Sequence, residues 1–189
     1  MLLKTLLMVV GFMIKNLHLP NTLIIVKLME NQPVKRVDIM AYAGKWYSLY
    51  SIPTFMDKHW RQKIETYVIH PDGYYAVFTT YNIMGEEKRK YIRSKLFVVR
   101  GTGNAIFKAQ LVWPFKVDYW VIELAEDYSY VVVGHPKCER LYIMSRKPDL
   151  PKELLDEVIG RCGKKGYDTG KLVFQEHKAA RHEPEKEHA

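Results

Sequence analysis

The sequence predicts an all-β domain followed by one C-terminal helix, with the strands arranged as an eight-stranded antiparallel up-and-down barrel. Three observations support this fold class. Eight short segments are rich in Tyr, Val, Ile, Phe or Thr; turn signals separate them; and only one later segment has helical periodicity. Short strands at regular spacing are typical of such a barrel.

The eight expected strands follow one another between residues 44 and 146. Pro71-Asp72-Gly73, Met84-Gly85 and Gly101-Thr102-Gly103-Asn104 are turn signals between them. In the fourth segment Ile92, Leu96 and Val98 fall on one face, with Tyr91, Arg93 and Lys95 on the other, which indicates a half-buried strand. The expected strands are residues 44–52, 62–69, 74–82, 89–99, 105–113, 118–125, 129–134 and 140–146.

The segment after the last strand predicts an amphipathic helix. Asp149 and Pro151 are start signals, and Gly163 and Gly166 can end the helix after a turn that contains cations. We expect its apolar stripe to pack against the outside of the barrel. The stripe consists of Leu154, Leu155, Val158, Ile159 and Cys162.

Both ends of the chain differ in composition from the segment that is expected to form the barrel. Residues 1–33 form a leader with two apolar runs, each shorter than the ~20 residues that span a bilayer. It is a secretory signal, an anchor, or an extension before a later start near Met29. The alternatives are therefore a periplasmic, secreted or membrane-associated protein, or a cytoplasmic one. Residues 34–176 form the domain, and residues 177–189 are expected to be a disordered polar tail.

Composition points to an anionic partner. The 189-residue chain has a formal net charge of +8, is 48% hydrophobic and contains 13 Tyr. A basic protein attracts membrane surfaces, nucleic acids and lipid carboxylates or phosphates, and charge alone does not choose among them. The cysteines Cys138 and Cys162 form either a disulfide or two apolar thiols.

Two signatures indicate how one end of the barrel is closed. Gly44-Lys45-Trp46-Tyr47 with Ile52-Pro53-Thr54-Phe55 stands at the first strand, and Leu141-Tyr142-Ile143-Met144-Ser145-Arg146 at the last. Together these signatures resemble the lipocalins. The resemblance implies that Gly44 lets the backbone bend, that Trp46 plugs the base of the barrel, and that the guanidinium of Arg146 lies over the indole. It also implies that the opposite end is an open cup.

The resemblance extends from Val34 to Glu176 and is closest to the bacterial lipocalin and apolipoprotein D branch. Three departures would change the volume and polarity of a cup: Ser48 replaces a usual Glu, and Trp113 and Ser94 each replace a Gly. Further matches to this branch are Tyr67, Asp72-Gly73, Pro114-Phe115, Asp118-Tyr119-Trp120-Val121, Tyr128, Gly166-Tyr167-Asp168 and Lys171-Leu172-Val173-Phe174.

The resemblance implies binding, with transport or sequestration, of a small lipophilic ligand such as a fatty acid or lysophospholipid, in membrane maintenance or stress. We expect a monomer or weak homodimer, with an anionic membrane surface as a second partner and no cofactor or metal. Arg93 and Lys95 are expected to pair with an anionic head. The expected wall residues, for which core packing is the alternative role, are Tyr50, Tyr67, Phe78, Phe97, Phe107, Trp113, Tyr119, Trp120 and Tyr142.

Two other functions compete with ligand binding. The segment Lys88-Arg89-Lys90-Tyr91-Ile92-Arg93-Ser94-Lys95 interleaves cations with aromatic residues, as in a barrel that binds single-stranded nucleic acid. A charged edge strand is the simpler interpretation, so no nucleic acid is expected. No nucleophile elbow, zinc motif or phosphate loop occurs in the sequence, which leaves an isomerase or hydrolase on a lipocalin scaffold as the enzymatic alternative.

Overall fold

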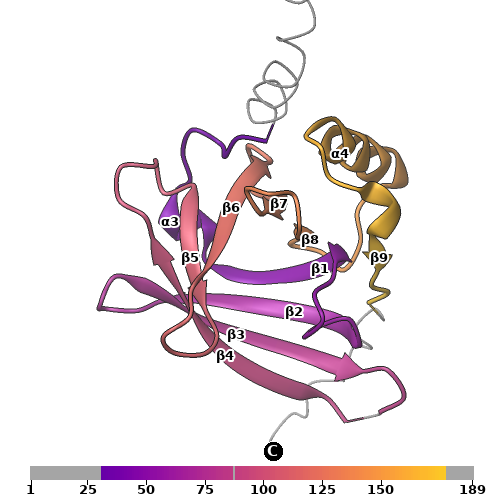
Figure 1. Ribbon diagram of the computed structural model, residues 1–189, viewed down its shortest axis with the longest axis horizontal. Coiled ribbons are helices and arrows are strands. Elements are labelled where there is room, and N and C mark those ends of the chain that lie inside the picture. Colours follow the sequence, from indigo (N-terminus) through magenta and orange to yellow (C-terminus); the bar gives the residue numbers. More distant parts are fainter. Residues whose placement is uncertain (1–30, 87, 178–189) are drawn as a thin grey trace, which may run out of the picture.

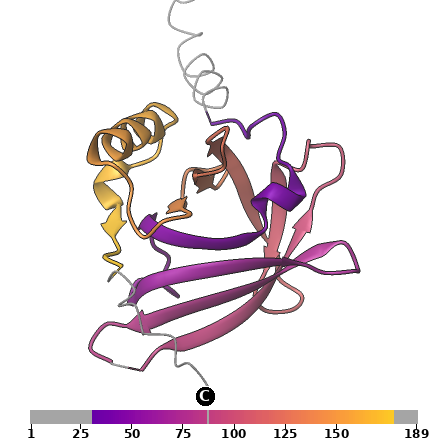
Figure 2. The same ribbon diagram turned by 180° about the vertical axis from the view of Figure 1, so that it is seen from behind.

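The protein forms a closed antiparallel β-barrel with one long helix outside it (Figures 1 and 2). The structure is a computed structural model that describes residues 31–86 and 88–177. The predicted fold class is confirmed, because eight strands follow one another around the barrel. They are β1 (Gly44–Ile52), β2 (Trp60–Ile69), β3 (Tyr74–Ile83), β4 (Lys90–Val98), β5 (Ile106–Gln110), β6 (Val117–Leu124), β7 (Tyr130–Gly134) and β8 (Leu141–Ser145).

Strand β1 closes the barrel because it pairs with both β2 and β8. Its first half pairs with β2, from Gly44 opposite Tyr67 to Tyr47 opposite Ile64. Its second half pairs with β8 on the other edge. Where β2 has diverged, the short strand β9 (Val173–Phe174) pairs with β1 instead.

The C-terminal residues also hold β2. The side chain of Gln175 accepts a hydrogen bond from the Lys63 N–H at 3.1 Å and donates one to the Trp60 carbonyl at 3.3 Å. Residues 173–175 therefore fill the gap between β1 and β2.

Helix α4 (Lys152–Lys164) packs on the outside of the barrel, as its apolar stripe predicts. Val158 and Cys162 are fully buried in a cluster that contains Ile122 of β6, Val132 of β7 and Ile143 of β8. No disulfide links Cys162 to Cys138. A 3-10 turn (Thr169–Lys171) then leads into β9.

A second helix, α3 (Ile39–Tyr42), crosses one end of the barrel. The Asp38 carboxylate caps it by accepting from the N–H groups of Met40 and Ala41 at 2.8 and 3.1 Å. Sequence periodicity did not predict this helix, because four residues are too few to show a helical pattern.

The folded part reaches past both expected domain boundaries. Asn31, expected in the leader, is buried and donates to the His135 carbonyl at 3.1 Å. His177, expected in the tail, lies 2.7 Å from the Ser48 carbonyl. Residues 1–30 of the leader and 178–189 of the tail lie outside the described residues. Among those described, no helix has the length and apolar character needed to cross a bilayer.

Candidate functional site

One pole of the barrel is closed by Trp46 and Arg146. Trp46 is fully buried, and the guanidinium carbon of Arg146 lies 3.7 Å from the centroid of its ring. Arg146 also donates to the carbonyls of Lys45 and Ala41 at 2.8 and 2.6 Å. The indole N–H donates to the Tyr42 carbonyl at 2.9 Å, which joins α3 to this seal.

Gly44 makes that arrangement sterically accessible. Its φ of +95° is in the left-handed region, where a side chain would strain the backbone. A Cβ at this position would lie 3.4 Å from Nη1 of Arg146, which is a close van der Waals contact with the end of a flexible side chain. Glycine is therefore needed at this position more for the backbone conformation than for the space around its Cα.

The other pole opens into a cavity of about 680 Å³ inside the barrel. Its wall is largely apolar, and its rim is formed by the β1–β2 connection and by residues 111–118, which run from the end of β5 into the start of β6. Phe55, Leu111 and Phe115 line the cavity although they are exposed, so they mark its mouth. The apolar wall below the mouth includes Val77, Ile92, Leu96, Ala109, Val133 and Met144.

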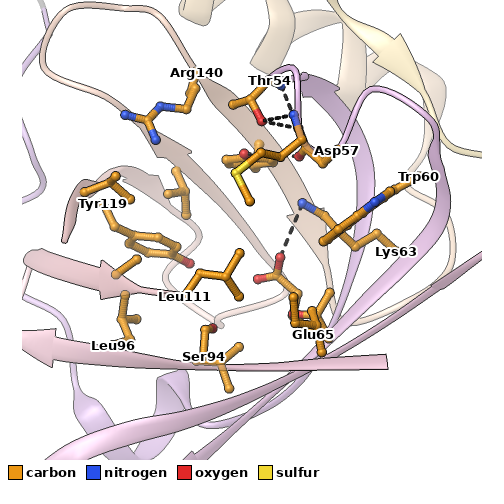
Figure 3. A pocket seen from close by; sticks show the side chains of 18 of the residues that line it. Thr54, Asp57, Trp60, Lys63, Glu65, Ser94, Leu96, Leu111, Tyr119 and Arg140 are labelled. Atoms are coloured by element: carbon orange, nitrogen blue, oxygen red, sulfur yellow. Dashed lines mark hydrogen bonds and ion pairs between the residues drawn. The ribbon is translucent and has the colours of Figure 1, made fainter. Parts of the chain in front are cut away.

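A buried ion pair stands on the β2 side of this wall (Figure 3). The ammonium of Lys63 lies 3.3 Å from a carboxylate oxygen of Glu65, and both side chains are largely buried. The same ammonium lies 3.9 Å from the centroid of the Tyr142 ring. The positive charge of Lys63 is therefore compensated within the protein by a carboxylate and an aromatic face.

Three tyrosines extend this polar group toward the closed pole. Tyr67 donates to the Glu65 carboxylate, and its hydroxyl lies 2.9 Å from that of Tyr119, which lies 2.7 Å from that of Tyr42. Burial, followed by the charge of Glu65, raises the pKa of the Tyr67 hydroxyl well above its usual value. Burial also raises the pKa values of Tyr42 and Tyr119. The three phenols therefore remain neutral hydrogen-bonding groups: Tyr67 and Tyr119 line the cavity, and Tyr42 lies behind them in the core cluster that contains Trp46.

Arg140 lies across the cavity from that ion pair, on the same side as Tyr119 (Figure 3). The carboxylate of Asp118, which also lines the cavity, is held by Lys108 at 2.7 Å. Asp57 accepts from the N–H and hydroxyl of Thr54 at 2.6 and 2.7 Å. Among the described residues, Arg140 is thus a lining cation for which the structure gives no hydrogen bond or ion pair.

The structure brings three of the expected wall residues to the cavity: Tyr67, Tyr119 and Tyr142. Phe107 is fully buried, in the core cluster that contains Tyr42 and Trp46. It packs edge-to-face with Tyr119 at 5.8 Å but does not line the cavity. Ligand contact by the three tyrosines stays a prediction.

Strand β4 presents the face opposite to the one expected for the ligand. Ile92, Ser94 and Leu96 line the cavity, and successive side chains of a strand point to opposite faces. Arg93 and Lys95, expected at an anionic head, are exposed on the outer surface. They lie over aromatic rings of β3 there: the Arg93 guanidinium carbon is 5.2 Å from the Phe78 centroid, and the Lys95 ammonium 4.7 Å from that of Tyr74.

The remaining expected residues also lie away from the cavity. Phe97 is beneath the Lys116 ammonium at 4.1 Å, and Tyr50 packs against Phe174 of β9 at 5.1 Å. Trp120 belongs to the cluster under α4, so Tyr119 is the inward residue of that pair. Trp113 is exposed in the connection between β5 and β6.

Sequence reasoning missed Lys63, Glu65 and Arg140. A signal for the first two was present, because they precede the expected wall residue Tyr67 by four and two positions in one strand and so share its face. Arg140 had no comparable signal, since it stands where a connection enters β8.

Comparison with known proteins gives a consistent result. Residues 37–177 match the family model described as a lipocalin-like domain. Outer membrane lipoprotein Blc of Vibrio cholerae is 28% identical over 144 residues, covering 76% of this chain and 84% of that protein. Temperature-induced lipocalin-1 of Arabidopsis thaliana is 26% identical over 152 residues, covering 76% and 81%.

Solved structures share the fold. Insecticyanin from the tobacco hornworm Manduca sexta superposes with a TM-score of 0.60 at 19% identity, covering 79% of this chain and 85% of that one. Lobster apocrustacyanin A1 gives a TM-score of 0.61 at 13% identity, covering 75% and 81%. The family model spans most of the chain, and the barrel has the matching architecture: the chain belongs to the lipocalin-like family.

Proposed function

We propose that this protein binds a single-chain amphiphile, such as a fatty acid or a lysophospholipid, in the barrel cavity and transports or sequesters it. The observation that carries the proposal is a cavity of about 680 Å³ with an apolar wall, closed at one pole and open at the other. That volume is typical of a site for a small organic ligand. The comparisons lend no support to the single-stranded nucleic-acid alternative.

The wall supplies the affinity for an acyl chain. Burying a methylene contributes about 0.8 kcal/mol, so ten methylenes contribute about 8 kcal/mol before the cost of immobilising the ligand. Side chains from β3, β4, β5, β7 and β8 provide this surface. We therefore expect the apolar tail to lie among Val77, Ile92, Leu96, Val133 and Met144.

Arg140 is the group that suits an anionic head. A guanidinium forms paired hydrogen bonds with a carboxylate or phosphate, and the structure gives Arg140 no competing partner among the described residues. Lys63 suits the role less well, since Glu65 already compensates its charge at 3.3 Å. The proposed head position therefore moves from Arg93 and Lys95, on the outer surface, to Arg140.

We propose binding without catalysis as the role of the cavity. No His or Cys is among the described residues that line it, and the hydroxyls of Thr54, Tyr67 and Tyr119 are paired with one another or with the carboxylates of Asp57 and Glu65. In the described ranges no three His, Cys, Asp or Glu side chains are grouped to hold a metal ion. We propose that the protein carries the ligand as a monomer or weak homodimer.

Native mass spectrometry of protein purified from a lipid-containing extract tests the proposal directly. We expect a bound species with the mass of a fatty acid or lysolipid, released by organic extraction. Protein that stays empty after repeated incubation with such lipids would contradict it.

Exchange of Arg140 tests where the head lies. Arg140→Gln should weaken binding of a long-chain fatty acid by about tenfold, because a charge-assisted hydrogen bond is lost. Binding of the fatty alcohol of equal length should change little, and so should fatty-acid binding by Lys137→Gln, a matched control at an exposed position in the same connection. Displacement of a fluorescent fatty acid measures these affinities in the wild type and both variants; equal losses for acid and alcohol in Arg140→Gln would exclude a head contact.

A further inference from the structure

Large apolar side chains are exposed around the cavity mouth. Phe55 in the β1–β2 connection is 85% exposed, and Trp113 and Phe115 between β5 and β6 are 83% and 73% exposed. Met84 after β3 is 60% exposed. Such side chains are costly to leave in water when they gather at one place, so a group of them marks an interaction surface.

These residues belong to one end of the barrel. The connections β1–β2, β3–β4 and β5–β6 all stand at the pole opposite Trp46, because successive antiparallel strands alternate in direction. The Met84 N–H donates to the His59 carbonyl at 3.0 Å, which joins two of the connections. Phe55 and Phe115 also line the cavity. We call the set Phe55, Met56, Met84, Val112, Trp113 and Phe115 the mouth collar.

Cations accompany the collar. The four connections at this pole, residues 53–59, 84–89, 111–116 and 135–140, contain six Lys or Arg and four Asp or Glu. Lys58 and Lys116 directly neighbour collar segments and are exposed. Aromatic and aliphatic tips with adjacent cations are the composition of surfaces that insert into the headgroup region of an anionic bilayer.

We propose that the mouth collar docks this protein on a lipid bilayer that contains anionic lipid, with the cavity mouth facing the membrane. This inference rests on the proposed function, because a bilayer is both the source and the destination of a single-chain amphiphile. With the collar inserted, the ligand's tail passes between bilayer and cavity without crossing water. A bilayer fits better than a second copy of the chain because the apolar side chains stand on separate connections around an opening rather than on one flat face.

Binding to vesicles by the full-length chain tests the docking surface. We expect the wild type to co-sediment with phosphatidylcholine vesicles containing phosphatidylglycerol. The double variant Trp113→Glu/Met84→Glu should bind these vesicles at least about tenfold more weakly than the wild type, since two interfacial apolar groups become charged. Neither residue lines the cavity. The matched control is Met40→Glu, which is 75% exposed in α3 at the closed pole and should bind as the wild type does.

Fluorescence gives an independent measurement. Lipids brominated near the headgroup should quench the wild type, and Trp113→Phe should lose the part of that quenching that comes from Trp113, which is 83% exposed. The quenching that remains should come from Trp60, which also lines the cavity, because Trp46 is fully buried at the other pole. Equal vesicle binding by the wild type and the double variant would overturn the proposal. The proposal would also be overturned if the wild type did not bind vesicles but formed a dimer in solution, and the double variant were a monomer.

Fatty-acid displacement in vesicle-free buffer separates this proposal from the proposed function. The double variant should bind the fluorescent fatty acid with the wild-type affinity. Loss of vesicle binding with intact fatty-acid binding supports the docking surface. Wild-type binding of fatty acid without any vesicle binding overturns docking alone, and failure of fatty-acid binding overturns the proposed function.

Discussion

The two poles of the barrel use the same kinds of residue in opposite ways. At the closed pole Trp46 is fully buried, and its indole lies under Arg146 and donates to the Tyr42 carbonyl. At the open pole Phe55, Trp113 and Phe115 are largely exposed. An aromatic side chain that is enclosed on all sides stabilises the fold, whereas one left in water is available to a partner.

That difference indicates that the closed pole contributes mainly to stability and the open pole mainly to binding. Substitutions at the closed pole should lower the free energy of unfolding and affect binding only through folding. Substitutions at the open pole should leave unfolding almost unchanged. The buried Lys63–Glu65 pair, in the wall between the poles, should combine both effects.

The largest effect is expected at the closed pole. Trp46→Ala removes a fully buried indole and leaves a cavity, so we expect the free energy of unfolding to fall by about 3–5 kcal/mol. Urea denaturation followed by circular dichroism measures it. A loss below about 1 kcal/mol would show that this pole is not a stability element.

Next is the ion pair of the wall. Lys63→Met leaves the Glu65 carboxylate buried without its cation, and we expect a loss of about 3 kcal/mol. The double variant Lys63→Met/Glu65→Leu should recover most of that loss, since no uncompensated charge remains. Urea unfolding of the wild type, both single variants and the double variant gives the coupling free energy; strict additivity would show that the two charges do not interact.

A smaller effect is expected for the cation over Trp46. Arg146→Ala should cost about 1–2 kcal/mol, because one cation–π contact and two hydrogen bonds to backbone carbonyls are lost. Arg146→Lys should recover less than half of this, as an ammonium cannot stack and reach both carbonyls. Thermal unfolding compares the three proteins. Full recovery by lysine would mean that charge alone matters.

The smallest effect on stability is expected at the mouth. Phe55→Ser should change the free energy of unfolding by less than about 0.5 kcal/mol, since most of the ring is already in water. The same urea titration applied to Phe107→Ser, a fully buried phenylalanine, is the matched comparison. Similar losses for the two variants would show that Phe55 is not an exposed rim residue in solution.

Much of the architecture was predictable because it depends on local patterns. The strands, the helix on the outside of the barrel and the stacking of Arg146 on Trp46 were expected from turn signals, periodicity and two short signatures. Strand ends were less predictable. The apolar residues Leu111 and Val112 suggested that the fifth strand continues, but β5 ends at Gln110, and both side chains are exposed at the cavity mouth.

The site was predicted less well, for a reason that β4 makes clear. The alternation of Ile92 and Leu96 with Arg93 and Lys95 correctly indicated a strand with one apolar face and one charged face. The charged face, however, was expected to contact the ligand. The apolar face turned inward, and the cations found aromatic partners on the outer surface. An apolar face gains more from enclosure than a charged one, which must give up water.

By itself the sequence determined which segments alternate as strands, where the backbone turns, and which indole and guanidinium meet at the closed pole. Only the tertiary structure decided that Tyr119 rather than Trp120 points inward, and that Lys63 and Arg140 stand on opposite sides of one cavity. The physical reason is that a strand's own pattern gives two faces, whereas closure of the barrel and the packing of α4 determine which face encloses the cavity.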